Sequence, residues 1–146
     1  MGTWERVLSF LPGNVHRRLH ELYHEHGAPL MAATHVDPRL RAAVVERASV
    51  VNADLCRRGV RPRSRRFRAA VVDLIDRLVD RITAPGAVLP KAAEPFSWFS
   101  LELAALTVLL VHHGHRPPRP GGMEWAGQVP AATFRRSASP PARPPI

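Results

Sequence analysis

The residues His20, Glu21 and His24 form the pattern H-E-x-x-H within this 146-residue chain. On a helix the two histidines lie one turn apart on the same face, so both could ligate a single zinc ion. Glu21 would then act as the general base that activates a zinc-bound water. The pattern therefore raises the hypothesis of a metal-dependent hydrolase with zinc as its cofactor.

The residues around this pattern argue against that hypothesis. Zinc peptidases hold the motif in a cleft among uncharged neighbours and add a third ligand from elsewhere, whereas here the flanks are charged, with Arg17, Arg18, Glu25 and His26. Leu30 stands where a longer form of the motif has its third histidine, and the substitutes His35, Glu46 and Glu102 belong to no second motif. We therefore expect no enzymatic activity, no catalytic residue and no cofactor. A zinc-dependent peptidase that uses His20, Glu21 and His24 remains the alternative.

Seven arginines fall within twelve residues that contain no acid: Arg57, Arg58, Arg61, Arg63, Arg65, Arg66 and Arg68. They span the end of one predicted helix, a loop with a proline, and the first turn of the next helix. Cations in a first helical turn oppose the helix macrodipole, so they do not serve fold stability there. The cluster suits phosphate, on the DNA backbone or on an anionic membrane surface. A solvated loop in an arginine-rich sequence is the alternative.

Nothing near the cluster is suited to reading a base sequence. The helix predicted after Arg68 is apolar on one side and carries Asp73, Asp76 and Asp80 on the other, which would repel DNA. No aromatic residues alternate with the arginines to stack on bases. We therefore expect contacts with the nucleic-acid backbone that do not depend on sequence.

Capping residues predict the helices that carry these side chains. Asp37 followed by proline starts a helix over 39–58 that ends before Gly59, and Ser64 starts another that runs to about residue 83. A third runs from about 95 to 113, with Gly114 as its stop. Shorter helices are expected over 3–11 and over 15–26, the latter ending at Gly27. With no strand pattern in evidence, the predicted fold class is all-α, a small bundle of four to five helices.

The segment 96–111, FSWFSLELAALTVLLV, is the most apolar stretch of the chain. Its sixteen residues would span roughly 24 Å as a helix, less than the ~30 Å of a bilayer core. Glu102 also lies within it. We interpret it as the central helix of the bundle, with a membrane-interfacial or partner-binding helix as the alternative.

The last 32 residues differ from the rest in composition. They hold eight of the fifteen prolines together with five arginines, and so are expected to bury little apolar surface. We therefore divide the chain into a helical domain, 1–114, and a disordered, basic, Pro-rich tail, 115–146. The histidines at the boundary, His112, His113 and His115, are interpreted as an extension of this tail, with weak metal binding as the alternative.

Composition indicates a basic protein of a reducing compartment. The net charge is +9, with 21 basic and 12 acidic residues, and Cys56 is the one cysteine. Of the basic residues only Lys91 is a lysine, which is typical of a GC-rich coding sequence such as that of a high-GC actinobacterium. We expect a cytoplasmic protein, with peripheral membrane contact as an alternative.

In length, in its arginine- and alanine-rich helical body, in the cluster RRGVRPRSRRFR and in its Pro/Arg-rich end, the chain resembles the small spread proteins of Streptomyces conjugative plasmids. The resemblance implies a non-enzymatic accessory protein of plasmid transfer and intramycelial spread, with other plasmid transfer proteins as partners. It assigns no functional residue. Another alternative is a helical adaptor protein of a GC-rich DNA virus.

Overall fold

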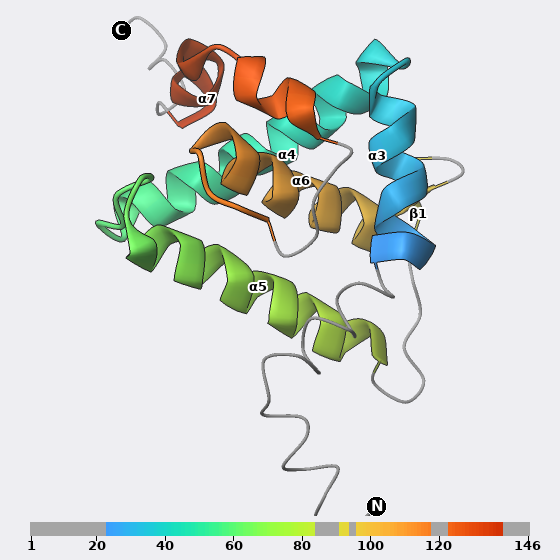
Figure 1. Cartoon of the computed structure of the whole chain (residues 1–146), viewed down its shortest axis with the longest axis horizontal. Coiled ribbons are helices and arrows are strands. Elements are labelled where there is room, and N and C mark those ends of the chain that lie inside the picture. Colours follow the sequence, from blue (N-terminus) through green and yellow to red (C-terminus); the bar gives the residue numbers. More distant parts are fainter. Residues whose placement is uncertain (1–22, 84–90, 94–95, 118–122, 139–146) are drawn as a thin grey trace, which may run out of the picture.

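The computed structural model describes residues 23–83, 91–93, 96–117 and 123–138 (Figure 1). Five α-helices lie in these ranges: α3 (Ala28–Thr34), α4 (Pro38–Arg57), α5 (Arg65–Thr83), α6 (Trp98–His112) and α7 (Ala131–Ala138). A π-helical turn, η1 (Tyr23–Gly27), precedes α3, and a 3-10 turn, η2 (Glu124–Gln128), precedes α7. Two short antiparallel strands, β1 (Lys91–Ala93) and β2 (Phe96–Ser97), precede α6. The all-α prediction is confirmed; the helix expected over 3–11 lies outside the described residues.

The capping residues act as the sequence predicts. The Asp37 carboxylate accepts hydrogen bonds from the backbone N–H groups of Arg39 (2.9 Å) and Leu40 (3.4 Å) at the start of α4. Ser64 Oγ accepts from the N–H of Phe67 (3.1 Å) at the start of α5. Gly59 and Gly114 follow α4 and α6, each with φ +77°, a left-handed conformation that glycine adopts without strain.

Helix α6 forms the centre of the bundle and contacts α3, α4, α5, η1 and η2 (Figure 1). Eleven of its fifteen residues are buried, and they point in all directions around its axis. Each large apolar side chain among them contributes about 1.5–3 kcal/mol by leaving water. The interpretation of 96–111 as a central helix is thus confirmed. None of the described helices combines the length and the apolar character needed to cross a membrane.

The start of the described chain differs from the prediction at Gly27. This glycine was expected to end a helix, but helical structure continues from η1 directly into α3. Gly27 has φ −90° and ψ −46°, which are right-handed helical values. Burial of Leu30, Met31 and Thr34 in the core provides the stabilisation that carries the helix past the glycine.

The segment expected to be a disordered tail from residue 115 also differs, over residues 123–138. Both η2 and α7 lie there, and α7 packs along α4 (Figure 1). Met123, Ala126 and Phe134 are buried, at 2% exposure or less. The helical domain thus reaches at least Ala138, because a few well-placed apolar residues dock a segment whose overall composition is polar and Pro-rich. Residues 139–146 lie outside the described ranges.

Candidate phosphate-binding surface

The H-E-x-x-H motif falls at the edge of the described part of the chain. His20 and Glu21 lie outside the described residues, and only the main chain of His24 is described, within η1. Over the ranges 23–83, 91–93, 96–117 and 123–138, no three His, Cys, Asp or Glu side chains gather as a metal site would require. The absence of a cofactor stays a prediction, and the zinc site of His20, Glu21 and His24 stays its untested alternative.

The structure gathers the seven predicted arginines at one end of the molecule. Arg57 ends α4, Arg58 caps it, and the others follow in the connection 59–64 and the first turn of α5. We call residues 57–68 the basic turn; it forms the corner where α4 and α5 meet (Figure 1). The helix ends and loop predicted around these arginines are therefore present as expected.

A defined backbone motif shapes the basic turn. The N–H of Val60 donates to the carbonyl of Leu55 (3.0 Å) and that of Gly59 to Cys56 (3.0 Å), the paired bonds of a Schellman motif. Val60 is buried, and Phe67 at the start of α5 is fully buried. Because both ends of the turn are anchored in the core, its arginines project from a backbone with a fixed course.

The arginines of the turn differ in how far their charge is neutralised. Asp54 pairs with Arg58 (2.9 Å) and more distantly with Arg57 (3.9 Å). Arg68 Nε donates to the carbonyl of Arg116 (3.2 Å). The other four are exposed and meet no carboxylate among the residues the structure describes: Arg61, Arg63, Arg65 and Arg66. Within the described ranges, one carboxylate therefore faces seven guanidinium groups, and four of these groups are exposed.

Two histidines that follow α6 contact residues of the basic turn, a role that the sequence did not indicate. His115 Nε2 donates to the Pro62 carbonyl (2.8 Å), and its ring stacks on Phe67 with centroids 5.8 Å apart. His113 Nε2 is hydrogen-bonded to Asn52 Oδ1 (3.0 Å), and its ring meets Phe67 edge-on. The interpretation of these histidines as part of a disordered tail was thus wrong.

His113 is adapted to remain uncharged beside the arginines. Burial, together with the nearby charges of His112, His115 and Arg63, lowers its pKa to about 4. The ring is therefore neutral at pH 7. It links α4, α5 and α6 without adding to the positive charge of the turn.

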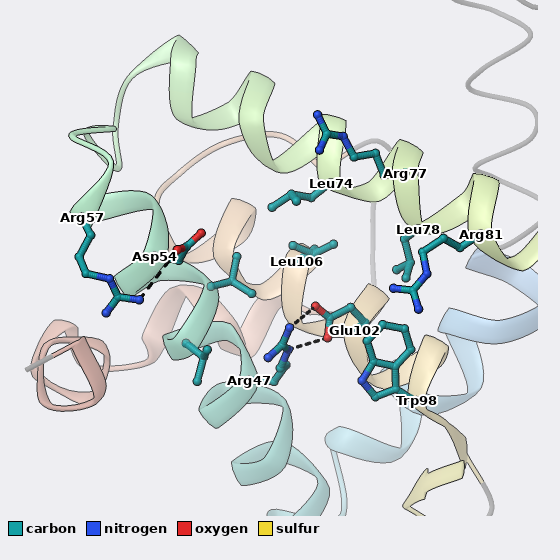
Figure 2. Close-up of a pocket in the computed structure, with 12 residues that line it drawn as sticks. Arg47, Asp54, Arg57, Leu74, Arg77, Leu78, Arg81, Trp98, Glu102 and Leu106 are labelled. Atoms are coloured by element: carbon teal, nitrogen blue, oxygen red, sulfur yellow. Dashed lines mark hydrogen bonds and ion pairs between the residues drawn. The ribbon is translucent and has the colours of Figure 1, made fainter. Parts of the chain in front are cut away.

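A second feature, a groove of about 460 Å³, lies between α4 and α5 with α6 as its floor (Figure 2). Across it, Arg47 and Glu102 form a bidentate ion pair, with Arg47 Nε 2.6 Å from Glu102 Oε2 and Arg47 Nη2 2.9 Å from Oε1. The hydrogen bond to Glu102 raises the pKa of Arg47. This pairing engages both oxygens of Glu102, which the sequence had suggested as a substitute zinc ligand.

Comparison of the chain with protein-family models, with curated proteins and with solved structures gives no match.

Proposed function

We propose that this chain is a non-enzymatic accessory protein whose basic turn contacts the phosphates of DNA without reading their sequence. The observation that carries the proposal is the set of exposed arginines without carboxylate partners in the described chain: Arg61, Arg63, Arg65 and Arg66. Guanidinium groups bind phosphate oxygens through paired, charge-assisted hydrogen bonds. A backbone anchored at both ends presents them with less loss of conformational freedom.

The position of the arginines at a helix start adds to the argument. The N-terminus of α5 carries partial positive charge, so Arg65 and Arg66 next to it are unfavourable for the isolated fold. The same arrangement is favourable when an anion is present, because the helix end and the side chains then attract it together. Anion binding therefore explains why arginines lie at this helix start, whereas fold stability does not explain it.

The basic turn has no exposed large apolar side chain, and this favours DNA over an anionic membrane as its partner. Stable attachment to a bilayer commonly combines basic residues with apolar side chains that insert between the lipids. In the described part of the chain the exposed large apolar residues are Val36 and Val50, and neither belongs to the basic turn. The turn therefore has the charge for phosphate without the anchor for lipid.

The resemblance to plasmid spread proteins provides the setting for this contact. A protein of the cytoplasm that holds plasmid DNA near the transfer apparatus needs affinity for any sequence and no catalytic chemistry. Other plasmid transfer proteins would then be its partners. A viral helical adaptor remains a different setting for the same surface.

Binding of the whole chain to two unrelated DNA duplexes and to anionic lipid vesicles tests the proposal. At low salt we expect both duplexes to bind with affinities within about threefold of each other, since non-specific binding depends on phosphate charge rather than on sequence. Vesicles should bind more weakly. Strong preference for one duplex, tighter binding to vesicles, or no DNA binding at low salt would each contradict the proposal.

A further inference from the structure

The groove between α4 and α5 has the shape of a helix-binding site. Its α4 wall is formed by Arg47, Val50, Val51, Asp54 and Arg57, which recur every three or four residues and so form one face over about 15 Å. Its α5 wall is formed in the same way by Leu74, Arg77, Leu78 and Arg81. The two helices diverge from the basic turn, and α6 closes the bottom between them (Figure 1). The result is an open trough that runs along helices.

The lining separates an apolar strip from a basic rim. Leu74, Leu78 and Leu106 point into the groove (Figure 2). The guanidinium group of Arg47 lies at Glu102 on the floor, and those of Arg57 and Arg81 lie towards opposite ends of the groove. Val50, one of the two exposed large apolar residues in the described chain, lines the groove at 49% exposure. An exposed apolar side chain within a concave apolar strip marks a binding surface more clearly than one on a convex face.

The charge of the rim indicates the chemistry of the partner. Arg81 lies over the ring of Trp98, 5.0 Å from its centroid, and within the described residues it has no carboxylate partner. Arg57 is 3.9 Å from an aspartate that it shares with Arg58. Arg77 pairs with Asp73 on the outer side of α5 (3.0 Å). Positive charge thus remains on both rims, and Glu102 at the floor is neutralised by Arg47.

We propose that this groove binds an acidic amphipathic helix of a partner protein. The apolar face of such a helix would cover Val50 and the leucines, and its carboxylates would meet Arg57 on one rim and Arg81 on the other. The first 22 residues of the chain itself do not have this charge, since they carry three arginines and two glutamates. The proposal does not depend on DNA binding by the basic turn.

Two synthetic helical peptides of about 14 residues test the partner chemistry. Both carry the same leucine face, and the remaining positions are glutamate in one and lysine in the other. By fluorescence anisotropy with the full chain, we expect the glutamate peptide to bind at least about tenfold more tightly than the lysine peptide. No binding of the glutamate peptide, or equal binding of the two, overturns the proposal.

Two substitutions locate the site. Val50→Arg adds positive charge, which alone would strengthen any general attraction to the glutamate peptide. Because the arginine side chain obstructs the apolar strip, we expect binding of that peptide to weaken roughly tenfold instead. Arg77→Glu with Arg81→Glu should weaken the glutamate peptide and strengthen the lysine peptide. Circular dichroism confirms that each variant is folded, and the opposite effects on the two peptides cannot result from misfolding.

A variant of the basic turn provides the control. Replacing Arg61, Arg65 and Arg66 by Gln should leave peptide binding within about threefold of wild type, since these residues do not line the groove. If this variant loses the peptide and Val50→Arg does not, the peptide binds the turn and the groove proposal is wrong. If sedimentation shows a dimer that Val50→Arg dissociates, the occupant is a second copy, and the proposal is also wrong. Val50→Arg should leave DNA affinity undiminished, so the two proposals fail separately.

Discussion

At the scale of single residues, the arginines divide into those that pair with a carboxylate and those that do not. Arg47 is held by both oxygens of Glu102, in a pair that is only 10% exposed on the glutamate side. Arg58 and Arg77 are each paired within their own helix. Arg61, Arg63, Arg65 and Arg66 have no such pair among the described residues. The second group is therefore available for an external anion, and the first is not.

The ion pair of Arg47 and Glu102 is a contact that the sequence does not predict. The two residues are 55 positions apart, and neither lies in a local pattern that indicates the other. The seven arginines of the basic turn, by contrast, lie within twelve consecutive residues and were predicted together. Contacts between distant segments depend on how helices pack, which residue types and spacing do not specify.

His113 should make the stability of the protein depend on pH. Its pKa is about 4 in the folded chain and about 6.5 when unfolded, so between these values the unfolded chain binds more protons. Stability should thus be complete above pH 6.5 and fall as the pH drops towards 4. Because the half-buried ring is partly screened by water, we expect a loss of about 1–2 kcal/mol.

Urea unfolding at several pH values between 5 and 7 measures this effect. His113→Gln retains a hydrogen-bonding group near Asn52 but does not titrate, so its stability should fall less steeply over this range. The interval above pH 5 limits the contribution of carboxylates. Equal slopes for the variant and the wild type would show that His113 is not the group responsible.

At the scale of elements, the sequence predicts helices well where local signals determine them. The starts of α4 and α5 are set by hydrogen bonds to the side chains of Asp37 and Ser64. The ends of α4 and α6 are followed by Gly59 and Gly114, which adopt a left-handed backbone conformation. The helices missed were α3 and α7, which are short. Short helices depend on tertiary packing more than on their own sequence. Helix α7 could not be predicted from composition, because prolines surround the few apolar residues that pack it against the core.

The docking of α7 predicts a role in stability for a residue in the expected tail. Phe134 is 2% exposed, and its ring lies 4.3 Å from that of His112. Phe134→Ala should lower the free energy of unfolding by about 3 kcal/mol, the lower end for a buried phenylalanine. Urea unfolding followed by circular dichroism measures it.

An exposed neighbour on the same helix controls for effects on α7 itself. Ala132→Ser should change the free energy of unfolding by less than about 0.5 kcal/mol, since Ala132 faces solvent. If Phe134→Ala is as stable as wild type, α7 does not dock in solution and the domain ends earlier, as composition had indicated.

At the scale of the whole molecule, two surfaces with different chemistry meet at one end. The basic turn offers charge without apolar contact, whereas the groove combines an apolar strip with a basic rim. Arg57 belongs to both. The two proposals together describe a connecting role, with DNA phosphates on the turn and an acidic helix in the groove.

The high arginine content of the chain provides the competing explanation for the basic turn. If arginines are frequent only because of coding bias, those in the turn should contribute to DNA binding no more than arginines elsewhere. Two variants with equal loss of charge separate these cases. One carries Arg61→Gln, Arg65→Gln and Arg66→Gln in the turn; the other carries Arg39→Gln, Arg77→Gln and Arg81→Gln on other faces, where all three arginines are exposed.

The most direct test of phosphate contact by the turn is the salt dependence of DNA affinity for these two variants and the wild type. Each phosphate contact adds about 0.9 to the slope of log affinity against log salt, so the turn variant should be flatter by up to about 2.7. The variant on other faces should keep nearly the wild-type slope. Equal flattening of both, or no change in the turn variant, would contradict the assignment of phosphate binding to the basic turn.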